Sequence, residues 1–243
     1  MVKSKRENNE DKEKELDYWV DRLKDMPEPL ALPTDRARPS SFDYKGSELE
    51  LPFSEADSRE FENFCREGGY SEYVLFLAAY GLLLSAASGK DDMIIGTPVA
   101  GRNISGSMGI CGPFINTLPL RLTPKKDLTV KEWLKSIRGE VTGLLDHQKI
   151  SLEDIITALD LPRGEQNALY SVMLTQSPVD ESGFMLDGGK MTFKAIPTGS
   201  VKMDMILEIA KRESRYLLRF SYASTLFDIN VDFDALKEDY FSH

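Results

Sequence analysis

The sequence predicts an α/β fold built as a layered sandwich. Segments with the 3.6-residue spacing of amphipathic helices are mixed with short apolar runs that are typical of strands. Residue types that begin helices stand just before several of the helical segments. No internal repeat interrupts this pattern, and 243 residues are enough to bury a substantial core. Helices packed against a sheet are the expected outcome.

The helices are predicted by spacing and by their start and stop signals. Apolar spacing predicts a helix over Asp11–Met26, and the polar residues 1–11 are expected to be a disordered arm. Thr129 and Glu132 form a capping box for a helix that carries Trp133. Further helices are expected after Ser54, with Phe61, Phe64 and Cys65 on one face, and at Glu72–Ala87, Leu152–Leu159 and Val231–Phe241. Glu72–Ala87 is apolar on nearly every side and should be buried.

The strands are predicted from alternation and from short apolar runs. We expect them at Leu49–Phe53, Met93–Val99, Phe114–Leu122, Leu169–Thr175, Lys190–Ile196, Met203–Ile209 and Arg215–Ala223. The glycine-rich loop Ala100–Gly112 separates two of them. It is not a phosphate-binding loop, because no Gly-Lys-Ser/Thr follows it.

Composition excludes several classes of function. The net charge of −10 argues against general binding of nucleic acid or of an anionic membrane, both of which require a positive field. The most apolar run, Tyr73–Ala87, is too short to span a bilayer comfortably. Cys65 and Cys111 are the only cysteines, and they give neither a metal-binding spacing nor a disulfide framework. A cytoplasmic location is therefore expected.

Six sequence blocks occur in an order that points to one family. The most specific is ICGPFINTLPLRL at Ile110–Leu122, which is similar to a "GxFxNTLxLR" block. The others are Tyr18-Trp19 followed by LALPTDRARP at Leu30–Pro39, Leu75–Arg102, His147-Gln148 followed by Leu152-Glu153, Leu169–Met173, and Val201–Met205 followed by Tyr222–Asp228. Together they resemble the condensation domains of nonribosomal peptide synthetases over about residues 15–241.

The resemblance implies a fold and a partner lobe. Condensation domains have two lobes similar to chloramphenicol acetyltransferase, with the active site in a tunnel between them. Residues 12–243 resemble only the C-terminal lobe, so we expect a two-layer sandwich with a mixed sheet and helices on one face. The family's catalytic motif, two adjacent histidines followed by Asp-Gly, is absent, since the only histidines are His147 and His243. No catalytic residue and no metal site are therefore expected, and the chain alone is predicted to be inactive.

The resemblance also implies a reaction and its partners. The family joins a carrier-bound aminoacyl amine to a carrier-bound acyl or peptidyl thioester, and this chain would form one wall of the tunnel. No cofactor is expected to bind directly, because phosphopantetheine arrives on carrier proteins. The expected partners are the N-terminal lobe, the donor and acceptor carrier proteins and an adjacent adenylation domain.

Two departures from the family pattern leave other functions open. Ile150-Ser151 replaces the family's Pro-Phe after His-Gln, and the "RDxSRxPLF" segment is reduced to RGEQNALY at Arg163–Tyr170. One alternative is a catalytically inactive module that recruits carrier proteins or partner enzymes. A second is a lobe of an epimerisation domain, although GPFINTLPLR argues against it.

Several residues are candidates for the tunnel. Asn116, Thr117 and Gly112 would face it by resemblance, where the Asn116 amide could orient a substrate. The alternative for Asn116 is a structural amide that bonds to nearby backbone. Arg102 and Arg121 are candidates for contact with a phosphopantetheine phosphate or for ion pairs.

Other candidates are given structural roles. His147 and Gln148 are expected to close a helix and steady the following loop, and Asp204 belongs to the late family block. Cys111 is expected to be a small buried side chain rather than a nucleophile. The turn-rich segment Gln176–Gly189 is a candidate for the part of this lobe that crosses to latch the other lobe.

Overall fold

A six-stranded sheet forms the centre of the protein in the computed structural model, which describes residues 2–101, 111–112, 114–162, 168–180, 183–192 and 196–228. The elements are α1 (Val2–Arg22), β1 (Gly46–Pro52), α2 (Glu55–Gly68), α3 (Glu72–Ser88), β2 (Met93–Val99), β3 (Asn116–Leu122), α4 (Val130–Asp146), α5 (Leu152–Ala158), β4 (Val172–Asp180), β5 (Phe184–Leu186), β6 (Gly189–Met191), β7 (Met205–Arg212) and β8 (Arg215–Ala223).

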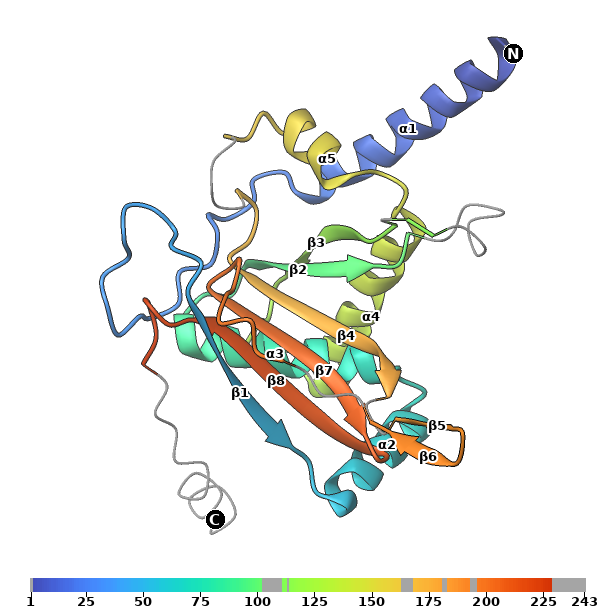
Figure 1. Cartoon of the computed structure of the whole chain (residues 1–243). Coiled ribbons are helices and arrows are strands. Elements are labelled where there is room, and N and C mark those ends of the chain that lie inside the picture. The colour runs from blue at the N-terminus through green and yellow to red at the C-terminus, as the bar shows by residue number, and fades with distance from the viewer. Residues whose placement is uncertain are drawn as a thin grey trace.

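The main sheet is mixed, with the strand order β1-β8-β7-β4-β2-β3. β4 runs parallel to both of its neighbours, β2 and β7, and the remaining pairs are antiparallel. Helices α2, α3 and α4 lie behind one face of the sheet, and α1 and α5 lie beyond the β3 edge (Figure 1). The predicted α/β sandwich with a mixed sheet is confirmed.

Local signals explain where the helices begin. Ser54 and Asp57 form a capping box at the start of α2, and Thr129 with Glu132 forms the predicted one at the start of α4. Ser71 caps α3 by accepting a hydrogen bond from the backbone N–H of Val74. Each cap satisfies backbone donors that have no partner inside the helix.

Helix α3 is the main core helix, but it is not buried on every side. Leu77 and Leu84 are almost fully buried, as the sequence predicts. Leu82 and Leu83, however, are 50% and 54% exposed. Because the helix has no polar face, its sequence could not predict that the side with Leu82 and Leu83 is exposed. Phe64 of α2 differs in the same way, since it is 51% exposed while Cys65 is buried.

The centre of the sheet depends on one close contact. Gly96 of β2 stands opposite Met173 of β4, and the Tyr170 ring lies directly against it. A Cβ atom at Gly96 would come within 2.3 Å of Tyr170 Cε2. Tyr170 is only 1% exposed, so a side chain added at Gly96 would push its ring against the packed interior.

Three predicted segments differ from the structure or lie outside it. The helix expected over Asp11–Met26 runs from Val2 to Arg22, and it includes residues 2–11, for which a disordered arm was expected. The Lys and Glu residues of that run are good helix formers despite their polarity. Of the strand expected at Lys190–Ile196, Lys190 and Met191 belong to β6, which pairs with β5 in a separate hairpin, and residues 193–195 lie outside the described residues. The helix expected over Val231–Phe241 lies outside the described residues.

No single helix within the described part of the chain is long and apolar enough to cross a membrane. Helices α2 and α3 pass that test of length and composition only as a pair, and they are bent by 106° where they meet.

We predict that Gly96→Ala lowers the free energy of unfolding by about 1–3 kcal/mol, because the new methyl group must displace the Tyr170 ring. Gly139→Ala in α4 is the matched control, because a Cβ there meets no atom within 4 Å. The control should raise stability by about 0.5–1 kcal/mol. Urea denaturation followed by circular dichroism measures both, and equal effects would contradict the role given to this contact.

Candidate functional site

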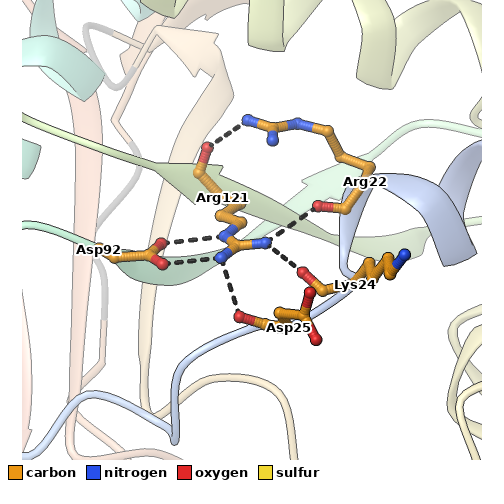
Figure 2. Close-up of polar contacts among 5 residues, drawn as sticks. All are labelled: Arg22, Lys24, Asp25, Asp92 and Arg121. Carbon is orange, nitrogen blue, oxygen red and sulfur yellow. Dashed lines mark hydrogen bonds and ion pairs between the residues drawn. The ribbon is translucent and has the colours of Figure 1, made fainter.

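Arg121 of β3 is the most heavily bonded of the predicted site residues (Figure 2). Its guanidinium makes two parallel hydrogen bonds to Asp92, Nε to Oδ1 at 3.0 Å and Nη2 to Oδ2 at 2.7 Å. It also donates to the backbone carbonyls of Lys24 at 2.7 Å and Asp25 at 3.1 Å. The hydrogen bond to Asp92 raises the pKa of Arg121 above its ordinary value. All three nitrogens of Arg121 therefore donate within the chain.

The end of α1 packs against Arg121. Arg22 donates from Nη2 to the backbone carbonyl of Arg121 at 3.1 Å, and it forms an ion pair with Glu140 of α4 at 2.6 Å. The Trp19 side chain, 1% exposed, donates from Nε1 to the His147 carbonyl at 2.9 Å. These contacts join α1 to both β3 and α4.

His147 ends α4 and packs against α1. Its backbone N–H donates to the Gly143 carbonyl at 3.1 Å, and its ring stacks on Tyr18 with centroids 3.8 Å apart. Its Nδ1 lies 3.4 Å from a Glu15 carboxylate oxygen. The neighbouring Gln148 donates from Nε2 to the Leu145 carbonyl at 2.7 Å. Both side chains lie where the end of α4 meets its neighbours.

Asn116 begins β3 and is half-buried. Its Nδ2 donates to the Ile150 carbonyl at 2.6 Å, which joins the sheet edge to the loop before α5. Thr117, next along the strand, stands opposite Pro98 of β2, and Gly112 is exposed in the loop before the strand. The bond to Ile150 is the arrangement expected of a structural amide.

Asp204 precedes β7 and is 3% exposed. Arg38 of the segment Leu30–Pro39 donates to both of its carboxylate oxygens, at 2.9 and 2.5 Å. This pair lies in the wall of a cavity of about 160 Å³. Cys111 is exposed, contrary to the buried side chain expected, because it lies in a loop rather than in the core. Arg102 lies outside the described residues.

Two charged clusters were not anticipated from the sequence. Arg219 of β8, 5% exposed, bonds to Glu50 of β1 at 2.9 Å and to Glu208 of β7 at 2.6 Å. Register places these three residues in one row across the sheet. The charged residues on these strands are visible in the sequence. The sequence does not give the order of the strands, however, so it could not predict that these three residues lie side by side.

The second cluster joins the helices to the sheet. Lys211 of β7 forms ion pairs with Glu62 of α2 at 3.0 Å and with Glu72 of α3 at 2.8 Å. Burial alone would raise the pKa of Glu72, but hydrogen bonds, first that from Lys211, hold it below its ordinary value. The cluster holds α2 and α3 against β7. Among the described residues, no group of three or more His, Cys, Asp or Glu side chains is arranged to hold a metal ion.

The candidate crossing segment contains more regular structure than its composition indicated. β4 continues to Asp180, and the hairpin of β5 and β6 follows outside the main sheet. Met185, Leu186 and Met191 of this hairpin are 67%, 53% and 49% exposed. Large apolar side chains so exposed mark a surface suited to a partner.

We predict that Arg121→Ala lowers the free energy of unfolding by about 1–3 kcal/mol, because it removes the charged donor of Asp92 and of two backbone carbonyls. Arg59→Ala in α2 is the control, since its pair with Glu55 is exposed on both sides. The control should cost less than about 1 kcal/mol. Thermal unfolding compares the two, and a neutral Arg121→Ala would remove the structural role of this residue.

We predict that Asn116→Ala lowers the free energy of unfolding by about 1 kcal/mol, because the Ile150 carbonyl loses its donor. Asn63→Ala, at an exposed position of α2, is the control, and it should change stability by less than about 0.5 kcal/mol. Guanidinium denaturation measures both variants. Equal stability of Asn116→Ala and the parent chain would show that this bond contributes nothing to the fold.

Known proteins share this architecture. The crystal structure of a four-domain nonribosomal peptide synthetase bound to AMP and glycine matches 88% of this chain with a TM-score of 0.81 and 22% identity, over 18% of its own length. The X-domain from teicoplanin biosynthesis matches 90% of this chain with a TM-score of 0.78 and 21% identity, over 50% of its own length. At these identities the matches establish the fold.

Sequence comparison gives the family. Surfactin synthase subunit 2 of Bacillus subtilis (strain 168) is 30% identical over 216 residues, which are 88% of this chain and 6% of that protein. The chain thus spans a small part of this curated relative. The model of the condensation domain family matches residues 2–231. This chain therefore belongs to the condensation domain family of nonribosomal peptide synthetases.

Proposed function

We propose that this chain is the C-terminal lobe of a condensation domain and that it forms one wall of the tunnel in which an amide bond is made. One observation carries the proposal. The matched chain of the X-domain and that of a condensation domain from the CDA synthetase are each covered over about half of their length, 50% and 49%. A match of that size is what one lobe of a two-lobed domain would give.

The reaction needs a second lobe. In the proposed reaction the amine nitrogen of a carrier-bound amino acid attacks the carbonyl carbon of a carrier-bound thioester. The new C–N bond forms, the C–S bond breaks, and the amine proton leaves with the thiol. The two histidines of this chain, His147 and His243, are not adjacent, and His147 packs against Tyr18 and Glu15. The base would therefore come from the N-terminal lobe.

The role proposed for this chain is to shape the tunnel and to dock partners. Phosphopantetheine would arrive attached to donor and acceptor carrier proteins, with no cofactor bound directly. Arg121 is a poor candidate for its phosphate, since all three of its nitrogens already donate to Asp92 and to backbone carbonyls. The exposed apolar hairpin of β5 and β6 is the surface we assign to the N-terminal lobe. The match covers 6% of surfactin synthase subunit 2, which leaves room for further domains such as the adenylation domain we propose, and the cytoplasmic location stays a prediction.

A second candidate function is a module that recruits partner enzymes without catalysis. It is favoured by one match, because the X-domain from teicoplanin biosynthesis has been crystallised in complex with OxyB and superposes on this chain with a TM-score of 0.79. The coding sequence upstream of this chain separates the two candidates. A His-His-x-x-x-Asp-Gly motif there supports the condensation enzyme, and a disrupted motif supports the recruiting module.

We predict that the isolated chain, mixed with two loaded carrier proteins, makes no dipeptide above background. The same chain joined to its N-terminal lobe should make dipeptide, because the joined form restores both the base and the tunnel. Mass spectrometry of the carrier-bound products measures this. The control is the joined form with both motif histidines changed to alanine, which keeps the tunnel but removes the base.

Two outcomes would contradict the proposal. Dipeptide formed by the isolated chain would place the catalytic base within these 243 residues. A joined form that binds both carrier proteins but makes no dipeptide, despite an intact histidine motif, would favour the recruiting module.

A further inference from the structure

We propose that a cavity between residues 29–42 and one end of the main sheet binds a small organic carboxylate with an apolar body. The cavity has a volume of about 160 Å³, and its walls come from three segments that lie far apart in the sequence. A cavity of about 150 Å³ in another protein holds a molecule of the size of benzene. The space therefore suits a ligand of that size, and the proposed condensation reaction makes no use of it.

The cavity lies at the end of the sheet where two parallel strands begin. Ser171 stands just before β4 and Asp204 just before β7, and both residues line the cavity. Asn116 lies at the opposite end, because it pairs with the last residue of β2, which also runs parallel to β4. The cavity is therefore at the far end of the sheet from the residues predicted to face the tunnel.

The charges in the cavity wall leave one positive charge unmatched. Arg38 donates from Nη1 and Nη2 to the two oxygens of Asp204, which is 3% exposed, so this pair is neutral as a whole. The hydrogen bond to Asp204 also raises the pKa of Arg38, so the guanidinium stays charged. Lys202 lines the cavity as well, and its ammonium forms no ion pair with any other described residue. A carboxylate can accept a charge-assisted hydrogen bond from that ammonium.

The rest of the wall favours an apolar body on the ligand. Leu30 and Tyr170 are almost fully buried, Phe42 and Met203 are half-buried, and all four side chains line the cavity. Displacing water from such carbon surface is favourable. Inorganic phosphate would leave this surface wet, so a carboxylate attached to a ring or to a branched chain is the better fit.

A strained residue holds one wall in place. Tyr44 adopts a φ of 59°, which is unusual for a bulky side chain. Its ring packs edge-on against Phe42 with centroids 5.1 Å apart, and its carbonyl accepts the backbone N–H of Val201 at 2.8 Å. Val201 precedes Lys202, so the strained residue connects two walls of the cavity. Strain of this kind is typical of ligand clamps, where the surrounding structure maintains it.

An NMR titration of the full chain with benzoate tests the proposal. Benzoate combines a carboxylate with one ring, and it should shift the amide signals of the residues that line the cavity. Benzyl alcohol has the same ring without the charge, and benzylamine carries the opposite charge. Benzoate should bind more tightly than either by about three- to fivefold, because the Lys202 ammonium at the exposed side of the cavity distinguishes them.

Paired variants test the location. Lys202→Gln should weaken benzoate binding by about three- to fivefold, whereas Lys131→Gln, at an exposed position of α4, should leave it unchanged. Ala31→Trp should abolish benzoate binding, because the added side chain fills the cavity from its exposed rim. Ala37→Trp is the control, since Ala37 is exposed nearby in the chain and is not a lining residue of the cavity. Circular dichroism checks that each variant is folded.

Four results would overturn the proposal. No shift at benzoate concentrations on the order of 10 mM would show that the cavity is not a binding site. Tighter binding of benzylamine than of benzoate would mean that Asp204, rather than Lys202, sets the preference. Equal affinity for benzoate and benzyl alcohol would leave an apolar cavity without a preference for charge. Benzoate binding that survives Ala31→Trp in a folded variant would place the site elsewhere.

Discussion

The bidentate pair between Arg121 and Asp92 is the constraint on which the layout of the N-terminal half depends. It joins the end of β3 to the turn before β2, and the free sides of the same guanidinium hold the chain just after α1. Asp25 adopts a φ of 50° at that point, a conformation that costs an L-residue roughly 1 kcal/mol or more. Because Arg121 donates to the carbonyls of Lys24 and Asp25, this turn is held, and the following segment Leu30–Pro39 reaches the Leu226 carbonyl through the backbone N–H groups of Asp35 and Arg36.

The position of α1 follows from that turn. Just before that turn, Trp19 lies against the end of α4, where its Nε1 donates to the His147 carbonyl. His147 in turn stacks on Tyr18, so the histidine most open to a catalytic interpretation is fixed between two helices. Arg121, a candidate for contact with a phosphate, and His147, a candidate base, therefore both hold α1 against the rest of the fold. This is why the proposed function assigns the chemistry to a partner lobe.

The sequence was informative wherever a local pattern decides the structure. Strand β3, the capping box of Thr129 and Glu132, and the core helix α3 follow from spacing and caps, and ordered blocks pointed to the family. What could not be predicted depends on contacts between distant segments. Asp92 gave no sign of its bond to Arg121, and the row of Glu50, Arg219 and Glu208 requires the strand order. Exposure of Leu83 was hidden for the same reason, since burial depends on what packs beside the helix.

The pairing of β1 with β8 has a consequence for synthesis of the protein. Gly46 lies opposite Ala223 and Pro52 opposite Leu217, so among the described residues the first strand pairs with the last one. Pairing between strands so far apart in the sequence requires closure of a long loop, which costs entropy before any contact forms. Folds dominated by such pairing form slowly. While the ribosome makes the chain, β1 waits with unpaired backbone groups until β8 has emerged. Its glutamates, Glu48 and Glu50, put charge on that waiting strand and discourage it from pairing with another nascent chain.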